Sequence, residues 1–278
     1  MSIRVLESTT EPHTKIMGVL NVTPDSFYHP SCVQSNQTLC AQAKAMVDAG
    51  AHIVDIGGES SKPGAKPVLQ EEELDRVIPA LEALKGKEYT LSVDTYRAET
   101  ARQSIMQGVK MINDITAFRG DENMAGVVAD AGVECVLMHM QGLPDTMQDA
   151  PHYNDVIDDI CAFFEERIEY ATKAGIQQDN IWLDPGFGFG KTVGHNLSIL
   201  QHLYTFKQFG CRVLMGTSNK STIGAVLNAD VHDRMEGTAA TVAVSICNGA
   251  DAVRVHDVEA MAKVARMTDA ALGRIHFD

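Results

Sequence analysis

The sequence predicts a single α/β domain, a (β/α)8 TIM barrel that spans residues 1–278. Three observations predict this fold. Short apolar runs of strand length recur along the whole chain, segments with helical periodicity separate them, and glycine follows several of the helical segments. Strands that alternate with helices pair in parallel through helical crossovers, and eight such units fill about 250 residues.

Eight apolar runs have the length of β-strands. They show little polar alternation, as expected for strands that are buried on both faces of a parallel sheet. We expect them at residues 15–21, 52–56, 90–94, 110–113, 134–139, 181–184, 212–216 and 252–256.

Helical periodicity is clearest between the first three runs. Apolar residues repeat at helical spacing over residues 39–47 and again over residues 74–84. Three glutamates at residues 71–73 precede the second repeat, as expected at a helix N-terminus. Glycines then stand where helix C-termini are expected, at Gly50, Gly132, Gly175 and Gly249.

An open, doubly wound sheet would show the same alternation of strands and helices. Periodicity does not reveal whether a sheet closes on itself, so this alternative stays open. No linker-like or low-complexity stretch divides the chain, and the sequence therefore predicts one domain.

The composition limits the class of partner. The formal charge is −14, from 23 basic and 37 acidic residues, whereas nucleic acids and anionic membranes need a basic face. The N-terminal segment is polar, and no apolar run approaches the length of a membrane span. We therefore expect a soluble, cytoplasmic protein that binds small molecules.

The six cysteines form no C-x-x-C pair. Cys135 and Cys211 lie in strand-like apolar runs, where reduced core thiols are common. This pattern favours free thiols over a metal site or a disulfide framework.

Within residues 181–192, an apolar run ends at one carboxylate, Asp184. Pro185 and three glycines follow it and predict a turn. The stretch mimics two phosphate-binding loops but matches neither, because Pro185 and Lys191 stand where those loops need glycine. An acid at the end of a buried strand is costly unless something pairs with it. We therefore expect Asp184 to bind a ligand and the glycines to turn the chain sharply.

Nearly every predicted strand ends in a polar residue, and in a barrel these ends converge on one rim. Any one of them could cap a helix or form a turn, but the repetition favours a shared site. One set is mixed in charge and suits a flat heterocycle with a guanidine-like edge, because carboxylates accept paired N–H donors. It consists of Asp94, Asn113, Asp184 and Lys220.

A second set is mostly cationic and suits an anion such as phosphate or diphosphate. It consists of Asn21, Lys62, Arg254 and His256. Arg254 and His256 are two residues apart, so on a strand they would share a face. Two structural alternatives stay open, since Arg254 could pair with Asp251 or Asp257 and His256 could be a supporting group.

Three further features are interpreted as structural. Met138, His139 and Met140 bring sulfur and imidazole to the rim, but the partners of a metal site are not evident. Small residues at 237–245 predict a helix that packs tightly on the barrel or on a second subunit. The acids at 155–169 predict a solvated helix face.

Seven segments carry a resemblance to a known family. They are residues 17–27 (MGVLNVTPDSF), 55–60 (DIGGES), 92–95 (SVDT), 112–115 (INDI), 137–142 (LMHMQG), 183–191 (LDPGFGFGK) and 254–257 (RVHD). On these motifs the chain resembles dihydropteroate synthase along nearly its whole length. The resemblance implies a transferase of folate biosynthesis that condenses 6-hydroxymethyl-7,8-dihydropterin diphosphate with para-aminobenzoate. It also implies Mg²⁺, a homodimer and inhibition by sulfonamides.

The resemblance also implies a role for each residue at a matching position. The pterin would be held by Asp94, Asn113, Asp184 and Lys220 and lined by Met138. The catalytic residues would be Asp94, Lys220 and Asn113. The departing diphosphate would bind Asn21, Arg254 and His256, with Asn21 next to the metal. The aminobenzoate would be surrounded by Phe27, Ser61, Lys62, Pro63, Phe189 and Ser218.

The implied chemistry explains why the sequence shows no nucleophile–base pair. In the family the bond to diphosphate breaks largely before the amine attacks, so the enzyme must stabilise a cationic pterin methylene. Asp94 is the natural electrostatic partner for that cation. An aromatic amine is already nucleophilic near neutral pH and needs no strong general base.

Three loop segments depart from the family pattern, all on the aminobenzoate and diphosphate side. Residues 60–64 read Ser-Ser-Lys-Pro-Gly rather than Ser-Thr-Arg-Pro-Gly, and residues 28–31 read Tyr-His-Pro-Ser rather than Ser-Asp-Gly-Gly. Asn219 replaces the arginine of Ser-Arg-Lys. Lys62 keeps the charge but loses the bidentate fork of arginine. Because the first two loops differ from the family pattern, we expect altered and weakened sulfonamide affinity.

Two alternative functions stay open on the sequence. The departures would fit a divergent paralogue that uses another amine or only binds pterins. A pterin-using methyltransferase that acts with a corrinoid protein would share the mixed set but needs no diphosphate pocket. The cationic set therefore speaks against the methyltransferase.

Overall fold

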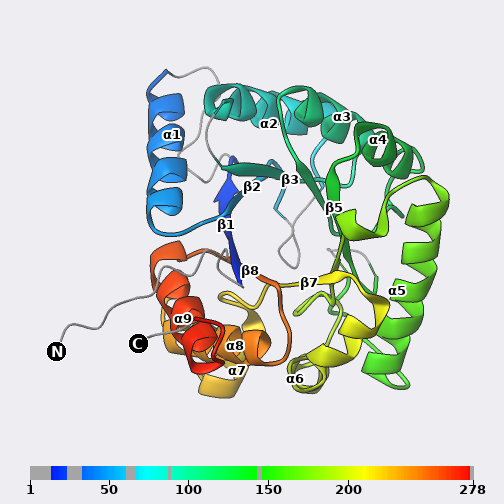
Figure 1. The fold of residues 1–278 in the computed structure, drawn as a ribbon, viewed down its shortest axis with the longest axis vertical. Helices are drawn as coiled ribbons and strands as arrows, with labels where there is room; N and C mark the ends of the chain where they lie inside the picture. The colour runs from blue at the N-terminus through cyan, green and yellow to red at the C-terminus, as the bar shows by residue number, and fades with distance from the viewer. Residues whose placement is uncertain (1–13, 24–32, 61–66, 87–88, 143–145, 276–278) are drawn as a thin grey trace.

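The computed structural model describes residues 14–23, 33–60, 67–86, 89–142 and 146–275. In this part of the chain, eight strands form one closed barrel in chain order, with β1 beside β8 (Figure 1). All neighbouring strands are parallel. The predicted (β/α)8 barrel is thus confirmed, and the open doubly wound sheet is excluded.

The strands lie where the apolar runs predicted them. Three match the predicted range, and the other five differ by one residue at one or both ends, where neighbour pairing decides the boundary. They are β1 Lys15–Asn21, β2 Ile53–Gly57, β3 Thr90–Asp94, β4 Met111–Asp114, β5 Glu134–Met138, β6 Ile181–Asp184, β7 Arg212–Met215 and β8 Ala252–Val255.

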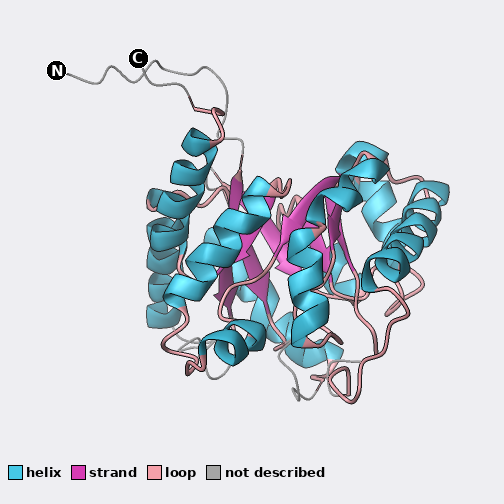
Figure 2. Cartoon of the chain, turned by 90° about the horizontal axis from the view of Figure 1, so that it is seen from below, coloured by secondary structure: helices cyan, strands magenta, loops and turns pink. Residues whose placement is uncertain are grey.

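Helices lie outside the strands, so the sheet is enclosed (Figure 2). They are α1 Val33–Asp48, α2 Gln70–Leu84, α3 Ala98–Met106, α4 Met124–Ala131, α5 Val156–Lys173, α6 Val193–Gln201, α7 Ser221–Leu227, α8 Met235–Cys247 and α9 Val258–Ala271. Two 3₁₀ helices precede β6 and β7, at η1 Gln178–Asn180 and η2 Leu203–Phe209. Within the described ranges, no helix has the length and apolar character needed to cross a membrane.

The glycines expected at helix ends have the backbone conformation that such ends require. All four, Gly50, Gly132, Gly175 and Gly249, adopt a positive φ between 63° and 109°. Glycine adopts this region without the strain that a Cβ atom would cause. The predicted helix stops are therefore confirmed.

A layer of apolar side chains fills the interior of the barrel. Its members are Met17, Ile53, Met111, Val136, Trp182, Leu214 and Ala252. Side chains two residues further along a strand point to the same face, so they form the next layer toward the C-terminal rim. In that layer the sequence changes to polar residues, among them Asp55, Asn113, Asp184 and Arg254. The mouth of the barrel is therefore polar above an apolar floor.

The cysteines of the described chain carry free thiols. Cys135 and Cys211 are buried, as predicted for core thiols. Cys40, Cys161 and Cys247 are partly or well exposed, and Cys32 lies outside the described residues.

Candidate active site

Arg254 joins the two predicted residue sets in the mouth of the barrel. Its Nε donates to Asp55 Oδ2 over 2.7 Å, and its Nη2 donates to Asp94 Oδ2 over 2.8 Å. The two partners left open by the sequence are wrong, because Asp251 pairs with a lysine of η2 and Asp257 caps α9. The guanidinium therefore lies beside the mixed set, and the two sets are continuous rather than separate.

Asp55 is a candidate site residue that the sequence interpretation missed. Its side chain is fully buried in β2, and its Oδ2 accepts from Arg254 and, over 3.1 Å, from Asn113 Nδ2. Within the described residues its Oδ1 has no hydrogen-bond partner. The available signal was an acid in the middle of the apolar strand IVDIG, where a carboxylate is stable only with partners.

Asp94, at the end of β3, has a pKa that is raised to about 7. Burial is the largest cause, since it disfavours the charged form. Arg254 opposes this rise, and the negative charge of Asp55 adds to it. Near neutral pH the carboxyl group is therefore divided between its charged and neutral forms, so it responds to any cation that enters the mouth.

Asp184, at the end of β6, is buried against the backbone of the turn that follows. Its Oδ1 accepts the N–H of Gly186 over 2.7 Å. Burial raises the pKa of Asp184, whereas that hydrogen bond and the nearby charges of Lys220 and Lys191 lower it. A carboxylate has about four lone-pair sites, so Asp184 keeps the capacity to accept further N–H groups from a ligand.

The glycines after Asp184 reverse the chain at the rim, as the sequence predicted. Gly186, Gly188 and Gly190 all adopt a positive φ. A Cβ atom on Gly186 would lie 1.9 Å from the carbonyl oxygen of His139, a distance that no real contact allows. The turn thus needs glycine for conformation and for close backbone approach, not for binding phosphate.

Lys220 and Phe189 form one wall of the mouth. Lys220 lies at the N-cap of α7, and its Nζ is 4.0 Å from the centroid of the Phe189 ring, a cation–π contact. Burial, with the charge of Arg254, lowers the pKa of Lys220 to about 8. Phe189 packs in an apolar cluster with Met138 and Met140, so the predicted pterin-lining and aminobenzoate-lining residues are neighbours.

His139 is buried and has a structural role beside the site. Its Nδ1 lies 3.0 Å from Lys191 Nζ. Burial, with the charges of Lys191 and Arg119, lowers the pKa of His139 to about 2, so the ring stays neutral. The described residues contain no group of three His, Cys, Asp or Glu side chains that could hold a metal.

Ser218 and His256 meet at the outer part of the rim. Ser218 Oγ accepts the backbone N–H of His256 over 3.2 Å and lies 3.0 Å from its Nδ1. His256 follows the last residue of β8 and is exposed, whereas Arg254 is directed into the mouth. Asn21 is exposed at the end of β1, the strand beside β8.

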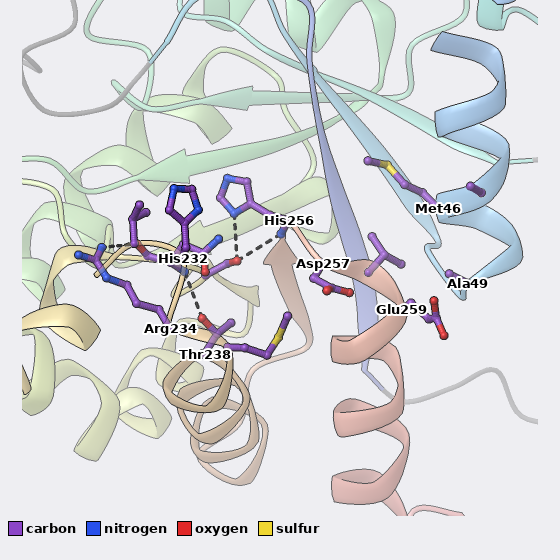
Figure 3. A pocket seen from close by; sticks show the side chains of 14 residues that line it. Met46, Ala49, His232, Arg234, Thr238, His256, Asp257 and Glu259 are labelled. Carbon is purple, nitrogen blue, oxygen red and sulfur yellow. Dashed lines mark hydrogen bonds between the residues drawn. The ribbon is translucent and has the colours of Figure 1, made fainter. Parts of the chain in front are cut away.

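A cavity of about 550 Å³ opens beside Ser218 and His256 (Figure 3). Arg234 and Thr238, from the start of α8, line one side, and Asp257 and Glu259, from the start of α9, line another. The cavity therefore carries both signs of charge.

Asn219, one of the family departures, is fixed by its backbone. It adopts a φ of 58°, which asparagine tolerates better than most residues. Its carbonyl oxygen accepts from Arg234 Nη1 over 2.9 Å, and its N–H donates to Thr238 Oγ1 over 3.2 Å. The guanidinium of Arg234 therefore approaches the rim beside the position where the family has arginine.

Arg97 is a second feature that the sequence interpretation missed. It pairs with Glu59, just before the second loop, and with Glu73 in α2, over 2.8 and 3.0 Å. Tyr96 Oη also donates to Glu59 over 3.0 Å. Glu73, expected only as a helix N-terminal acid, is thus buried in a network that ties the loop after β2 to the loop after β3.

Four predicted aminobenzoate residues lie outside the described part of the chain: Phe27, Ser61, Lys62 and Pro63. The departure at residues 28–31 lies there too. The remaining predicted residues all lie at the C-terminal rim, where strand order brings them together.

Comparison with known proteins assigns this geometry to a family. The family model described as "Pterin binding enzyme" matches residues 17–256. The dihydropteroate synthase of Synechocystis sp. is 44% identical over 259 residues, which cover 92% of this chain and 90% of that protein.

Solved structures agree with this relationship. The Yersinia pestis dihydropteroate synthase, in complex with a sulfonamide drug, superposes with a TM-score of 0.89 at 39% identity and covers 98% of this chain and 100% of its own. The Xanthomonas albilineans dihydropteroate synthase, in complex with 7,8-dihydropteroate, superposes with a TM-score of 0.82 at 36% identity and covers 94% of each chain.

Proposed function

The chain belongs to the pterin-binding enzyme family, and from this membership we propose how its rim carries out the family reaction. It condenses 6-hydroxymethyl-7,8-dihydropterin diphosphate with para-aminobenzoate to give 7,8-dihydropteroate and diphosphate, a reaction of folate biosynthesis. The chain therefore acts as a dihydropteroate synthase. The observation that carries this conclusion is the polar rim, where the strand ends bring together Asp94, Asn113 and Asp184 from the family motifs, on a barrel that superposes with a product complex.

The pterin is assigned to the mixed set. Asp184 accepts hydrogen bonds from the paired N–H groups of the guanidine-like edge, while Asn113 and Lys220 form hydrogen bonds with the ring carbonyl and ring nitrogens. The support is their convergence on one mouth, where Asn113 is oriented by Asp55 and Lys220 is in the electrostatic range of Asp184. Met138 provides an apolar side to this pocket.

Asp94 is assigned the stabilisation of the cationic methylene that forms as diphosphate leaves. A carboxylate in a buried mouth acts strongly on a charge that develops beside it, because little water screens the interaction. Arg254 lies 2.8 Å from Asp94 and offers a cation to the leaving diphosphate, with His256 and Asn21 further out on the rim. The aromatic amine then attacks without a general base.

The aminobenzoate is assigned to the side of the mouth that Phe189 and Ser218 border. Phe189 offers an apolar face, and Ser218 Oγ offers a hydrogen-bonding group beside His256. Phe27, Ser61, Lys62 and Pro63 are assigned to this side by their matching positions in the sequence.

Mg²⁺ is proposed to arrive with the diphosphate and to contact Asn21. This ion keeps several waters and is usually bound by one or two protein oxygens together with substrate phosphates. A single amide oxygen at the exposed end of β1 fits that mode, and no three-ligand cluster competes in the described residues. When bound, the ion would neutralise charge on the diphosphate.

A homodimer is proposed to form through α7, α8 and α9, which lie side by side (Figure 1). Large apolar side chains are exposed there, and such a face on a soluble protein usually has a partner. They include Leu227, Met235, Val244 and Met267, with Val231 between α7 and α8. Sedimentation should give a dimer that Val244→Glu with Met267→Glu converts to a monomer, and a wild-type monomer would contradict the proposal.

The chain is proposed to work in the cytoplasm. The support is chemical, because the described cysteines are free thiols, as expected in a reducing compartment.

Sulfonamides are proposed to bind in place of the aminobenzoate, and more weakly than to relatives with the usual loop. The support is the sulfonamide complex of the Yersinia pestis relative, together with lysine in place of arginine at position 62. Lys62→Arg should therefore lower the inhibition constant. Equal constants for the wild type and Lys62→Arg would contradict this proposal.

Complementation tests the function in a cell. A bacterial strain that lacks its own synthase should grow without added folate-pathway products when it expresses this chain. The Asp184→Asn variant, expressed at the same level, should not support growth. Failure of the wild-type chain at ordinary aminobenzoate levels would overturn the proposed reaction.

A further inference from the structure

Lys191 ends the glycine turn, and its ammonium group is enclosed by the backbone of that turn. The residue is 3% exposed. Its Nζ lies 3.0 Å from the carbonyl oxygens of Gly186 and Phe189 and 3.0 Å from Nδ1 of His139. In the described chain no carboxylate oxygen lies within ion-pair distance of this nitrogen, so its partners are dipoles.

The geometry matches what an ammonium group can donate. Its three N–H groups have four acceptors within hydrogen-bond distance, because the carbonyl oxygen of His139 also lies 3.4 Å away. These contacts offset part of the cost of removing a charge from water. Two of the acceptors belong to the turn itself and two to the residue after β5. The nitrogen therefore connects the turn after β6 to the end of β5, in addition to the backbone hydrogen bond from His139 N–H to the Asp184 carbonyl oxygen.

The turn is built closely around this nitrogen. A Cβ atom on Gly186 would lie 3.3 Å from Lys191 Nζ, in addition to its overlap with the His139 carbonyl. Gly188 and Gly190 also adopt a positive φ, but a Cβ atom there would meet Lys220 and the carbonyl oxygen of Gln141 instead. Burial is the largest cause that lowers the pKa of Lys191, to about 7, and the charge of Asp184 opposes this fall, so near neutral pH the ammonium form is present together with the neutral amine. The turn is thus built around a side chain that it carries itself.

The residues that the ammonium group holds also border the site. Phe189, whose carbonyl accepts from Lys191, places its ring 4.0 Å from the ammonium of Lys220. Gly186, whose carbonyl also accepts from Lys191, donates its N–H to Asp184 Oδ1. A shift of the turn would therefore move the acceptor assigned to the pterin and the wall assigned to the aminobenzoate together.

We propose that Lys191 is a positioning residue, a tethered monovalent cation that fixes the turn between Asp184 and Phe189 for both substrates. This inference rests on the proposed function, because it assigns the turn a task in that reaction. Lys191 does not touch either substrate. Its effect passes through the carbonyl groups of Gly186 and Phe189.

Chemical rescue tests the proposal. Lys191→Ala removes three methylene groups and the ammonium group, a fragment that n-propylammonium reproduces. At neutral pH the variant should lose about 100-fold in kcat/KM for aminobenzoate, the size expected from a displacement of about 1 Å. Calorimetry with 6-hydroxymethylpterin should show weaker binding, and n-propylammonium should restore both quantities by about tenfold or more.

Three controls separate a positioning role from a general loss of structure. n-Propanol has a similar shape without the charge and should not rescue Lys191→Ala, and choline chloride controls for ionic strength. Lys191→Met fills the space without a charge and should fold, lose activity and resist rescue. Lys173→Ala removes an exposed lysine that pairs with Glu169 on α5 and should match the wild type.

The outcomes are distinguishable from a failure of the proposed function. If the wild type forms no dihydropteroate, the reaction is wrong, but weaker pterin binding by Lys191→Ala with rescue by n-propylammonium would still support the tethered cation. Wild-type kcat/KM and pterin affinity in Lys191→Met would overturn it. So would an inactive but folded Lys191→Ala that n-propylammonium does not restore.

Discussion

The buried carboxylates of the barrel mouth are stabilised by different partners. Asp55 and Asp94 share the guanidinium of Arg254, while Asp184 accepts a backbone N–H and lies near the charge of Lys220. Burial raises the pKa of Asp94 and Asp184, and neighbouring cations limit the rise. The same residues therefore offer acceptors to a pterin and a negative charge to a developing cation.

Asp184→Asn should weaken pterin binding by about 2–4 kcal/mol, because an acceptor becomes a donor that faces N–H groups. Titration calorimetry with a pterin would measure the change. Asp158→Asn, an exposed acid on α5, is the matched control and should leave pterin affinity unchanged. Unchanged affinity in Asp184→Asn would remove Asp184 from the site.

The pH dependence of kcat/KM for the dihydropterin diphosphate should report the ionisation of Asp94. Its pKa is raised to about 7, so the carboxylate is lost as pH falls through that value and gained as pH rises. Only the carboxylate stabilises a cationic methylene, so kcat/KM, which reports the free enzyme, should rise with pH through about 7 and then level off.

Asp55→Asn should move that acidic limb to lower pH. The negative charge of Asp55 is one cause of the raised pKa of Asp94, and its removal also leaves Arg254 more available to Asp94. A profile that is flat in the wild type, or one that moves to higher pH in Asp55→Asn, would contradict this assignment.

The site residues at strand ends could be predicted from the sequence, whereas the residues that form hydrogen bonds and ion pairs with them could not. Asp94, Asn113 and Asp184 each follow an apolar run, so counting strands places them on one rim. Asp55 lies inside a strand, and its partner Arg254 is 199 residues away. Such a pairing depends on barrel closure, and the sequence signal of an acid within a buried strand does not identify its partner.

At the scale of elements, the turn after β6 shows how local conformation prepares a site. Three glycines with positive φ reverse the chain between Asp184 and Lys191. The sequence predicted the turn and excluded a phosphate loop. It did not predict that Lys191 turns back into the loop, because that depends on the carbonyl of His139 at the end of β5.

Gly186→Ala should destabilise the fold by about 3 kcal/mol or more, because the new Cβ would overlap a backbone carbonyl at a positive φ. Gly126→Ala is the matched control, since Gly126 lies in α4 with open space around it and should gain up to about 1 kcal/mol. Urea unfolding followed by circular dichroism measures both. Equal stability of the two variants would contradict the described turn.

At the scale of the whole molecule, the architecture could be predicted because strand length and helical periodicity repeat along the chain. The one-residue differences at strand ends follow from neighbour pairing, which no single run specifies. The charge also has a whole-molecule pattern. A chain of net charge −14 concentrates Arg254 and Lys220 in one mouth, where an anionic substrate can bind.

The most direct test of the central claim is turnover by the purified protein. Incubated with Mg²⁺, 6-hydroxymethyl-7,8-dihydropterin diphosphate and para-aminobenzoate, it should release one diphosphate for each 7,8-dihydropteroate formed, with a rate that saturates in aminobenzoate. Diphosphate release without dihydropteroate, or no release from a folded protein that binds pterin, would contradict the account.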